Sequence, residues 1–557
     1  MKTQTKVLKK WDLVRKNPIF WIGLVIFCVG LFGIGTFVRK ALVGELDKFF
    51  TKDAIMTAEM RLNEPTLQRL QQLFPTTDLG TLFSNITQDK FGLDWDEDIQ
   101  PWIGSNIGFA LFDKGDFILA AKYRSRAKAE KFLDRFRLPD ETFEIRSVGG
   151  GELWIPAYSS NIALGFYKGY VLFSTSEKIL SENFLDSEKI ADTEKYQAIQ
   201  RDIPSQWAFN FFIDTEKFAQ HFFNTGQYAV QKPVFQAITQ ALPAAGLAVK
   251  LDQEAFTVHS KFLTTEGVFA EREIPHDANQ TMPELAQFAP QNVLFFMNGA
   301  DLYQKYVHTK QFLEGFDPQF SVIFDGVLRG ISRQYFGEKF DFEKDLLSRF
   351  HGQYAILLDF EDVLSPFVNF TLITGFGGPD MEQNLSELHD VIHFAQTQFL
   401  TEKKEVKLPD GSMREELVAV DEATIPIQKK EFDGVTYYTA ENAGQGKQFS
   451  YTFVEGYFLF STYEQGIRSM VSAYQGKTGN LAQNEDFRES VLFRYSPSES
   501  YGFFNVEKLA SALELLSTTE NPDNPWISAF RAGIRNFTFA RKVFPEAVFW
   551  TGTLFLR

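Results

Sequence analysis

The sequence is almost devoid of cysteine, since Cys28 is the only one among 557 residues. A single thiol excludes an intramolecular disulfide and any cysteine cluster that would bind zinc or an iron–sulfur centre. The fold must therefore be held by packing, for which 60 phenylalanines provide abundant apolar surface. A chain of this length exceeds what one hydrophobic core usually supports, so we expect two domains with attached segments.

Motifs that carry chemistry are also missing. No serine stands in the Gly-x-Ser-x-Gly setting of a nucleophile elbow. The glycine runs Gly149-Gly150-Gly151 and Gly377-Gly378 lack the lysine and the strand-to-helix context of a phosphate loop. We therefore expect a protein that is not an enzyme, with no catalytic residue, no metal ligand and no cofactor.

Two weaker patterns invite a metal interpretation. His389 and His393 are four residues apart on an expected helix, a spacing that can bring two imidazoles to one ion, but Asp390-Val391-Ile392 leaves out the glutamate of a His-Glu-x-x-His motif. Asp94-x-Asp96-x-Asp98 resembles the start of a calcium loop, but the glycine and the final glutamate of that loop are absent. Both patterns favour ordinary surface residues over a metal site.

Basic charge is scarce beyond the N-terminus. The net charge is −16, and the first 40 residues carry eight basic side chains and one acidic one, so that +7 there leaves −23 for the remainder. Such an acidic chain repels phosphates instead of releasing their counterions. Nucleic acid is therefore excluded as an expected partner.

Residues 18–38 contain no charged side chain, and this apolar run is long enough to cross a bilayer, which takes about 20 residues. The basic residues before it predict a cytoplasmic N-terminus. We therefore expect a basic cytoplasmic tail at 1–17, a transmembrane helix at 18–38 and a stem at 39–52 in a single-pass protein of the plasma membrane, with everything beyond extracytoplasmic. The alternative is a cleaved signal peptide, but the apolar run exceeds a typical signal core.

One stretch occurs twice. Residues 168–175 read Lys-Gly-Tyr-Val-Leu-Phe-Ser-Thr, and residues 455–462 read Glu-Gly-Tyr-Phe-Leu-Phe-Ser-Thr. Each copy joins a glycine turn to an apolar strand and a helix start. The chain is therefore interpreted as a duplication, with one ectodomain repeat at 53–265, a linker at 266–287 and a second repeat at 288–557.

The strand and helix signals predict the fold class. Short hairpins alternate with amphipathic helices in both repeats, which is typical of an α+β fold built from antiparallel sheets with helices on one face. Asp94 and Asp341 each precede a short helical pattern and are predicted N-caps. The second repeat carries a charged insertion at 401–430, interpreted as a solvated loop or small hairpin.

These features resemble one family. The opening Pro290–Phe296, the Asp-aromatic helix with its trailing glycine (Asp94–Gly104 and Asp341–Gly352) and the repeated Gly-Tyr-x-Leu-Phe-Ser-Thr strand are similar to the bacterial domain-of-unknown-function 3352 family. The resemblance implies a bacterial envelope protein that faces outward. It supplies no catalytic residues to carry over.

Three functions remain open, in order of preference. The first is a membrane-anchored, extracytoplasmic interaction or scaffold protein of the bacterial envelope, which binds a protein or another envelope component without turnover. The second is a carrier for an apolar ligand such as lipid, suggested by the phenylalanine content. The third, a hydrolase or metal enzyme, rests on His389 and His393 and is the least favoured.

Overall fold

The computed structural model divides the chain into two compact units. The first comprises Met1–Gly267 with Asp523–Arg535 and Val543–Arg557, and the second comprises Val268–Pro522 with Asn536–Lys542. The structure describes residues 46–61, 95–136, 142–156, 163–185, 188–204, 207–223, 232–251, 255–265, 282–316, 318–336, 340–360, 368–377, 380–396, 401–407, 412–419, 427–442, 447–494, 500–517, 534–544 and 546–556.

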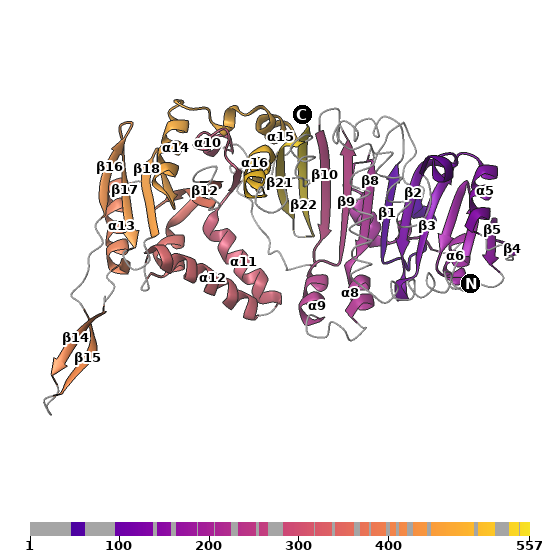
Figure 1. Ribbon diagram of the computed structural model, residues 1–557, viewed down its shortest axis with the longest axis horizontal. Coiled ribbons are helices and arrows are strands. Elements are labelled where there is room, and N and C mark those ends of the chain that lie inside the picture. Colours follow the sequence, from indigo (N-terminus) through magenta and orange to yellow (C-terminus); the bar gives the residue numbers. More distant parts are fainter. Residues whose placement is uncertain are drawn as a thin grey trace. The chain divides into compact units, whose positions relative to one another are not determined.

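The first unit contains an antiparallel sheet. Its strands run in the order β4-β5-β6-β7-β3-β2-β1-β8-β9-β10-β22, and each neighbour pairs antiparallel (Figure 1). The strands are β1 (Met56–Arg61), β2 (Ile103–Leu111), β3 (Phe117–Tyr123), β4 (Phe143–Val148), β5 (Gly151–Pro156), β6 (Ala163–Tyr167), β7 (Tyr170–Ser174), β8 (Phe209–Asp214), β9 (Ala244–Leu251), β10 (Ala255–Leu263) and β22 (Ala547–Leu556).

The second unit repeats this order with different strands. Its sheet runs β16-β17-β18-β19-β13-β12-β11-β20-β21, again antiparallel throughout. The strands are β11 (Phe295–Gly299), β12 (Phe350–Phe360), β13 (Val368–Phe376), β16 (Gln428–Phe432), β17 (Val435–Asn442), β18 (Lys447–Val454), β19 (Tyr457–Ser461), β20 (Ser500–Asn505) and β21 (Ile534–Phe544).

The stretch that occurs twice in the sequence forms β7 and β19, which hold the same place in the two orders. β7 lies between β6 and β3, and β19 lies between β18 and β13. Each is entered through a turn with two positive φ angles, 45° at Lys168 and 88° at Gly169, then 49° at Glu455 and 82° at Gly456. Two-residue hairpin turns of this kind need a residue that tolerates positive φ, which explains why the glycine recurs.

Helices pack on both faces of the sheet, in the first unit as in the second. Along β7, Tyr170 and Leu172 belong to the core beneath α6, whereas Val171 belongs to the core beneath α5. The expected arrangement with helices on one face is therefore incorrect, because successive side chains of β7 point alternately into two apolar layers. The helices are α5 (Arg126–Phe136), α6 (Glu177–Phe184), α7 (Glu194–Gln200), α8 (Thr215–Phe223), α9 (Lys232–Ala241), α10 (Met282–Ala286), α11 (Leu302–Phe316), α12 (Pro318–Phe336), α13 (Met381–Gln396), α14 (Glu464–Tyr474), α15 (Glu485–Arg494) and α16 (Val506–Ser517).

The expected fold class of two tandem domains, each with a sheet of its own, is wrong. The described strands are assigned to one antiparallel sheet of 20 strands and a separate hairpin, not to two self-contained sheets. The C-terminal strand β22 pairs with β10 of the first unit over its whole length, from Ala255 beside Phe555 to Leu263 beside Ala547. The physical reason is that the edge of β10 carries backbone groups that need partners, and β22 provides them.

The expected transmembrane helix at 18–38 lies outside the described residues. Among the residues that are described, no helix has both the length and the apolar character needed to cross a membrane. The tail at 1–17 and residues 39–45 of the stem at 39–52 also fall outside the described ranges, whereas residues 46–52 of the stem pack against the first unit.

Two local predictions can be followed in the structure. The Asp341 side chain accepts a hydrogen bond from the Lys344 N–H (3.2 Å) and caps the short helical turn Phe342–Leu346, whereas Asp94 lies outside the described residues. The insertion at 401–430 contains the antiparallel pair β14 (Thr401–Lys407) and β15 (Met413–Ala419), which form a sheet of their own.

We predict that Thr551→Pro weakens the pairing of β10 with β22. Thr551 lies beside His259 at the middle of the β10–β22 ladder, where proline removes an amide donor and places its ring against the neighbouring strand. Hydrogen exchange should become faster at β10 amides, and the melting temperature of the first unit should fall by a few degrees, as about 1–2 kcal/mol would produce. Thr551→Val, which keeps the amide, is the control, and equal exchange in both variants would contradict the prediction.

Candidate functional site

The first unit buries a cluster of polar side chains on one face of its sheet. Thr57 and Glu59 alternate along β1 with Met56, Ala58 and Met60, so the polar side chains point to the face opposite the methionines. Glu59 is only 1% exposed, and its Oε1 accepts a hydrogen bond from Asn106 Nδ2 of β2 (3.0 Å). A carboxylate this deeply buried is uncommon in a protein interior and requires polar neighbours.

Asp47 and Tyr196 complete the cluster from the surrounding elements. Asp47 belongs to the short turn Leu46–Lys48 and is 3% exposed, and its Oδ2 accepts a hydrogen bond from the Tyr196 hydroxyl of α7. Thr57 also hydrogen-bonds to the Asp47 carboxyl group. In the part of the chain that the structure describes, no lysine or arginine forms an ion pair with Asp47.

Burial raises the pKa values of both Asp47 and Tyr196, because it disfavours their charged forms. Burial raises the pKa of Asp47 to about 6, although the hydrogen bonds from Tyr196 and Thr57 offset part of the rise. Burial also raises the pKa of Tyr196, and the nearby charges of Asp47 and Glu59 raise it further. At neutral pH Asp47 is therefore mostly ionised, but its ionisation inside the cluster is less favourable than ionisation in water.

The second unit has an equivalent backbone arrangement in which the acidic and hydroxyl side chains of the cluster are absent. The hydrogen bond from Ile190 N to Phe50 O (2.9 Å) corresponds to the one from Leu481 N to Ala289 O (2.8 Å). The bond from Asp214 N to Ile55 O (2.9 Å) likewise corresponds to that from Asn505 N to Leu294 O (2.8 Å). These bonds and the matching strand registers fix which residues of the two units are equivalent.

Every acidic or hydroxyl group of the cluster is replaced at its equivalent position. Asp47 corresponds to Ala286, Thr57 to Phe296, Glu59 to Asn298 and Tyr196 to Phe487. In the second unit the rings of Phe296 and Phe487 pack against each other at 5.8 Å. The fold therefore does not require the buried carboxylates, and their presence in the first unit is a property of that unit alone.

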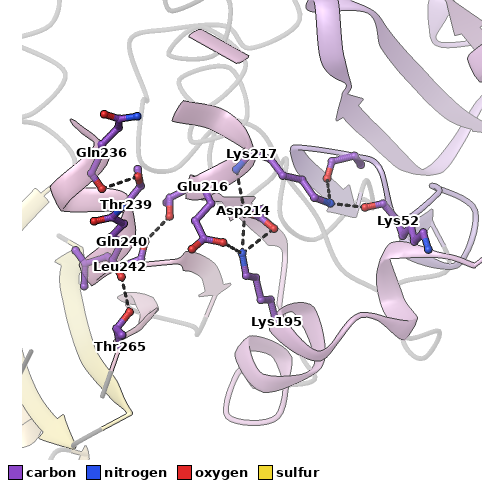
Figure 2. A network of polar contacts seen from close by, with 12 residues as sticks. Lys52, Lys195, Asp214, Glu216, Lys217, Gln236, Thr239, Gln240, Leu242 and Thr265 are labelled. Carbon is purple, nitrogen blue, oxygen red and sulfur yellow. Dashed lines mark hydrogen bonds and ion pairs between the residues drawn. The ribbon is translucent and has the colours of Figure 1, made fainter. Parts of the chain in front are cut away.

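A charged network lies beside this cluster at the start of α7. Lys195 Nζ contacts both Asp214 carboxylate oxygens (3.0 and 3.1 Å) and Glu216 Oε2 (2.6 Å), as Figure 2 shows. Burial alone would lower the pKa of Lys195, but the hydrogen bonds to Glu216 and Asp214 outweigh it and raise the pKa. Asp214 also accepts from Lys217 N (3.1 Å) and so caps α8, which makes this network a structural clamp between α7 and α8.

The second unit has a network of its own at the start of α14. Glu464 accepts hydrogen bonds from Lys430 Nζ (2.6 Å) and from the Tyr437 hydroxyl (2.7 Å), and Arg468 also contacts it. Although burial favours protonation, the bonds from Lys430 and Tyr437 dominate and lower the pKa of Glu464 to about 2. The equivalent carboxylate of the first unit, Glu177, is held by Arg146 at 2.8 Å.

Of the histidine and aspartate patterns, the structure describes the side chains of His389 and Asp98. The His389 ring packs edge-on against Tyr438 (4.7 Å between centroids) and near Tyr451 (5.8 Å), while the side chain of His393 is outside the described set. The Asp98 carbonyl oxygen accepts from Trp102 Nε1 (2.8 Å). Among the described residues, no group of three histidine, cysteine or acidic side chains is placed to hold an ion.

The second unit also exposes an apolar helix face. On α12, Val322 and Ile323 are 70% and 60% exposed, and Val327 and Ile331 continue the same face at 55% and 51%. Gly326 and Gly330 lie on this face with open space around both Cα positions. These six residues, which we call the α12 face, place aliphatic side chains in water where a surface helix normally carries polar ones.

Neither the buried polar cluster around Asp47 and Tyr196 nor the α12 face was predicted from the sequence. Thr57 and Glu59 give a period-two polar signal in the first strand, but Asp47 and Tyr196 are far away in sequence and join it only through the fold. The α12 face was detectable in principle, because residues 322, 323, 326, 327, 330 and 331 recur at helical spacing with no charged residue among them. The sequence alone could not tell which face of α12 is buried.

The chain belongs to the family described as "Protein of unknown function (DUF3352)", whose model matches residues 21–556. No curated protein matches the chain. Among solved structures, crystal form III of TP0453 is 9% identical, with a TM-score of 0.24, covering 44% of this chain and 87% of that one. Crystal form I of TP0453 is 11% identical, with a TM-score of 0.24, covering 42% of this chain and 82% of that one.

We predict that Glu464→Gln destabilises the second unit by about 1–2 kcal/mol at pH 7, because charge-assisted hydrogen bonds from Lys430 and Tyr437 are weakened. A lowered pKa means that the carboxylate contributes stability above its unfolded value near 4.5 and loses that contribution as the pH falls toward 2. Denaturant unfolding at pH 7 and pH 3 should therefore show a smaller difference between variant and wild type at pH 3. Glu431→Gln, on the exposed side of β16, is the control, and a pH-independent difference would contradict the assignment.

Proposed function

We propose that this member of the DUF3352 family is a non-catalytic interaction protein that binds an amphipathic helix of a protein partner on the α12 face. The observation that carries the proposal is the exposure of Val322, Ile323, Val327 and Ile331, each more than half accessible to solvent. Contiguous exposed apolar surface on a soluble domain marks an interaction site more often than a neutral surface does.

The shape of the α12 face favours a helix as its occupant. Gly326 and Gly330 are one turn apart, and nothing lies within 4 Å of a Cβ built at either position. Glycine inside a helix costs about 1 kcal/mol relative to alanine, so two exposed glycines are expensive unless something uses the space. A lane of glycines flanked by β-branched side chains lets a second helix approach closely, with its ridges between those of α12.

Charge and area argue against the other occupants. The net charge of −16 repels anionic lipid headgroups, whereas the exposed Arg329 beside the α12 face can pair with a carboxylate on a protein partner. A second copy of the chain is disfavoured because six residues on one helix fall well short of the roughly 800 Å² per partner that a stable dimer buries. An amphipathic helix with an acidic flank therefore fits best.

We predict that a photo-crosslinking amino acid at position 327 captures one protein partner in living cells, whereas the same amino acid at Glu489, an exposed position on α15, captures none at comparable yield. Mass spectrometry of the crosslinked peptide should locate it in an amphipathic helix. A synthetic peptide of that helix should bind the purified protein, and Val327→Glu should weaken binding by about tenfold or more, which corresponds to about 1.4 kcal/mol.

Three results would contradict this proposal. Adducts of equal yield at both positions would show that the α12 face has no specific partner. Adducts with lipid would favour the alternative of an apolar-ligand carrier, and adducts with a second copy of the chain would make the face a self-association surface. The melting temperature of Val327→Glu must match that of the wild type, because the substituted side chain is already exposed.

A further inference from the structure

We propose that residues 46–50 form a proton-gated latch in the first unit, which stays seated while Asp47 carries a proton and loosens when Asp47 ionises. The latch comprises the turn Leu46–Lys48 and the following Phe49 and Phe50. It goes beyond the proposed interaction function because it lies in the other unit and involves none of the residues of the α12 face.

The latch is seated by apolar side chains and a few backbone bonds. Leu46 and Phe50 are fully buried, and Phe49 packs edge-on against Tyr167 and Tyr170 at 5.5 and 5.1 Å. The Phe50 carbonyl accepts from Ile190 N (2.9 Å). Leaving its seat would thus expose a compact apolar segment and free the carboxyl group of Asp47 to enter water.

The charge balance around Asp47 makes its seating depend on protonation. The groups that face it are Tyr196 from α7 and Thr57 from β1, with Glu59 of β1 and Asn210 of β8 close to Tyr196. The hydrogen bonds from the Tyr196 and Thr57 hydroxyls offset only part of the cost of burying the Asp47 carboxylate. The nearby Glu59 is itself acidic and supplies no positive charge to balance it. A seated, ionised Asp47 is therefore disfavoured relative to the same group in water.

The second unit supplies an internal comparison. Its equivalent segment, with Leu285, Ala286 and Phe288, is seated in a core where Ala286 replaces Asp47 and Phe487 replaces Tyr196. At the position of Asp47 that segment carries Ala286, which has no ionisable side chain. The buried Asp47–Tyr196 pair is therefore not needed to seat such a segment, and the property it adds to the first unit is sensitivity to pH.

The sign of the effect follows from the raised pKa. Burial raises the pKa of Asp47 from 3.8 to about 6, so the seated state binds a proton more tightly than the open state. Stability of the seated state is therefore gained as the pH falls through 6 and lost as it rises from about 4 to above 6. With these values the opening equilibrium should change about tenfold between pH 5 and pH 8.

Hydrogen exchange on the full chain tests the latch. After correction for intrinsic exchange, protection at the amides of Phe49 and Phe50, which both bond to the Leu46 carbonyl, should be about tenfold higher at pH 5 than at pH 8. In Asp47→Asn the protection should be independent of pH. The equivalent segment 285–288 of the second unit should show no pH dependence in either protein and serves as the internal control.

A second variant keeps the test decisive if Asp47→Asn folds poorly. Tyr196→Phe removes a hydrogen bond that stabilises the ionised carboxyl group, so the midpoint of the pH profile should move upward while its shape is retained. A flat wild-type profile, an unchanged profile in Asp47→Asn, or a downward shift in Tyr196→Phe would each overturn the proposal.

Discussion

The rest of the structure depends on how one central strand in each unit pairs with its two antiparallel neighbours. This strand is β1, between β2 and β8, in the first unit and β11, between β12 and β20, in the second. Because side chains alternate across a strand, this register decides which residues face the helices and which face the other layer. It sets Glu59 beneath α7 in one unit and Asn298 at the same place in the other. A shift by one residue would exchange the polar and apolar faces.

Local sequence patterns predicted what local geometry determines. The glycines of the two hairpin turns and the capping role of Asp341 follow from backbone constraints that act within a few residues. The pairing of β22 with β10 could not be predicted, because it joins segments nearly 300 residues apart and no short pattern encodes the partner of an edge strand. The same reason hid the contact between Asp47 and Tyr196, which are 149 positions apart.

The matching strand orders of the two units allow a comparison within one molecule. Two sets of strands share one order, yet the carboxylates and hydroxyls that one encloses are replaced in the other by Ala286, Asn298 and the edge-to-face rings of Phe296 and Phe487. Aromatic packing stabilises a core without dependence on pH, whereas a buried carboxyl group with a raised pKa costs stability at neutral pH. Stability alone favours the second arrangement, so retention of the first in the same chain points to a role other than holding the fold together.

The α12 face presents the complementary argument at the surface. On the same helix Phe324 and Leu328 are half-buried against the rest of the second unit while Ile323 and Val327 face solvent, so two sides of α12 carry apolar side chains. A helix with apolar side chains on two sides normally has packing partners on both of them. Gly326 and Gly330 add to the free-energy cost of this exposed surface, because glycine weakens a helix and exposes its backbone. The sequence of α12 is thus better suited to a helix with partners on two sides than to one that partners only its own unit.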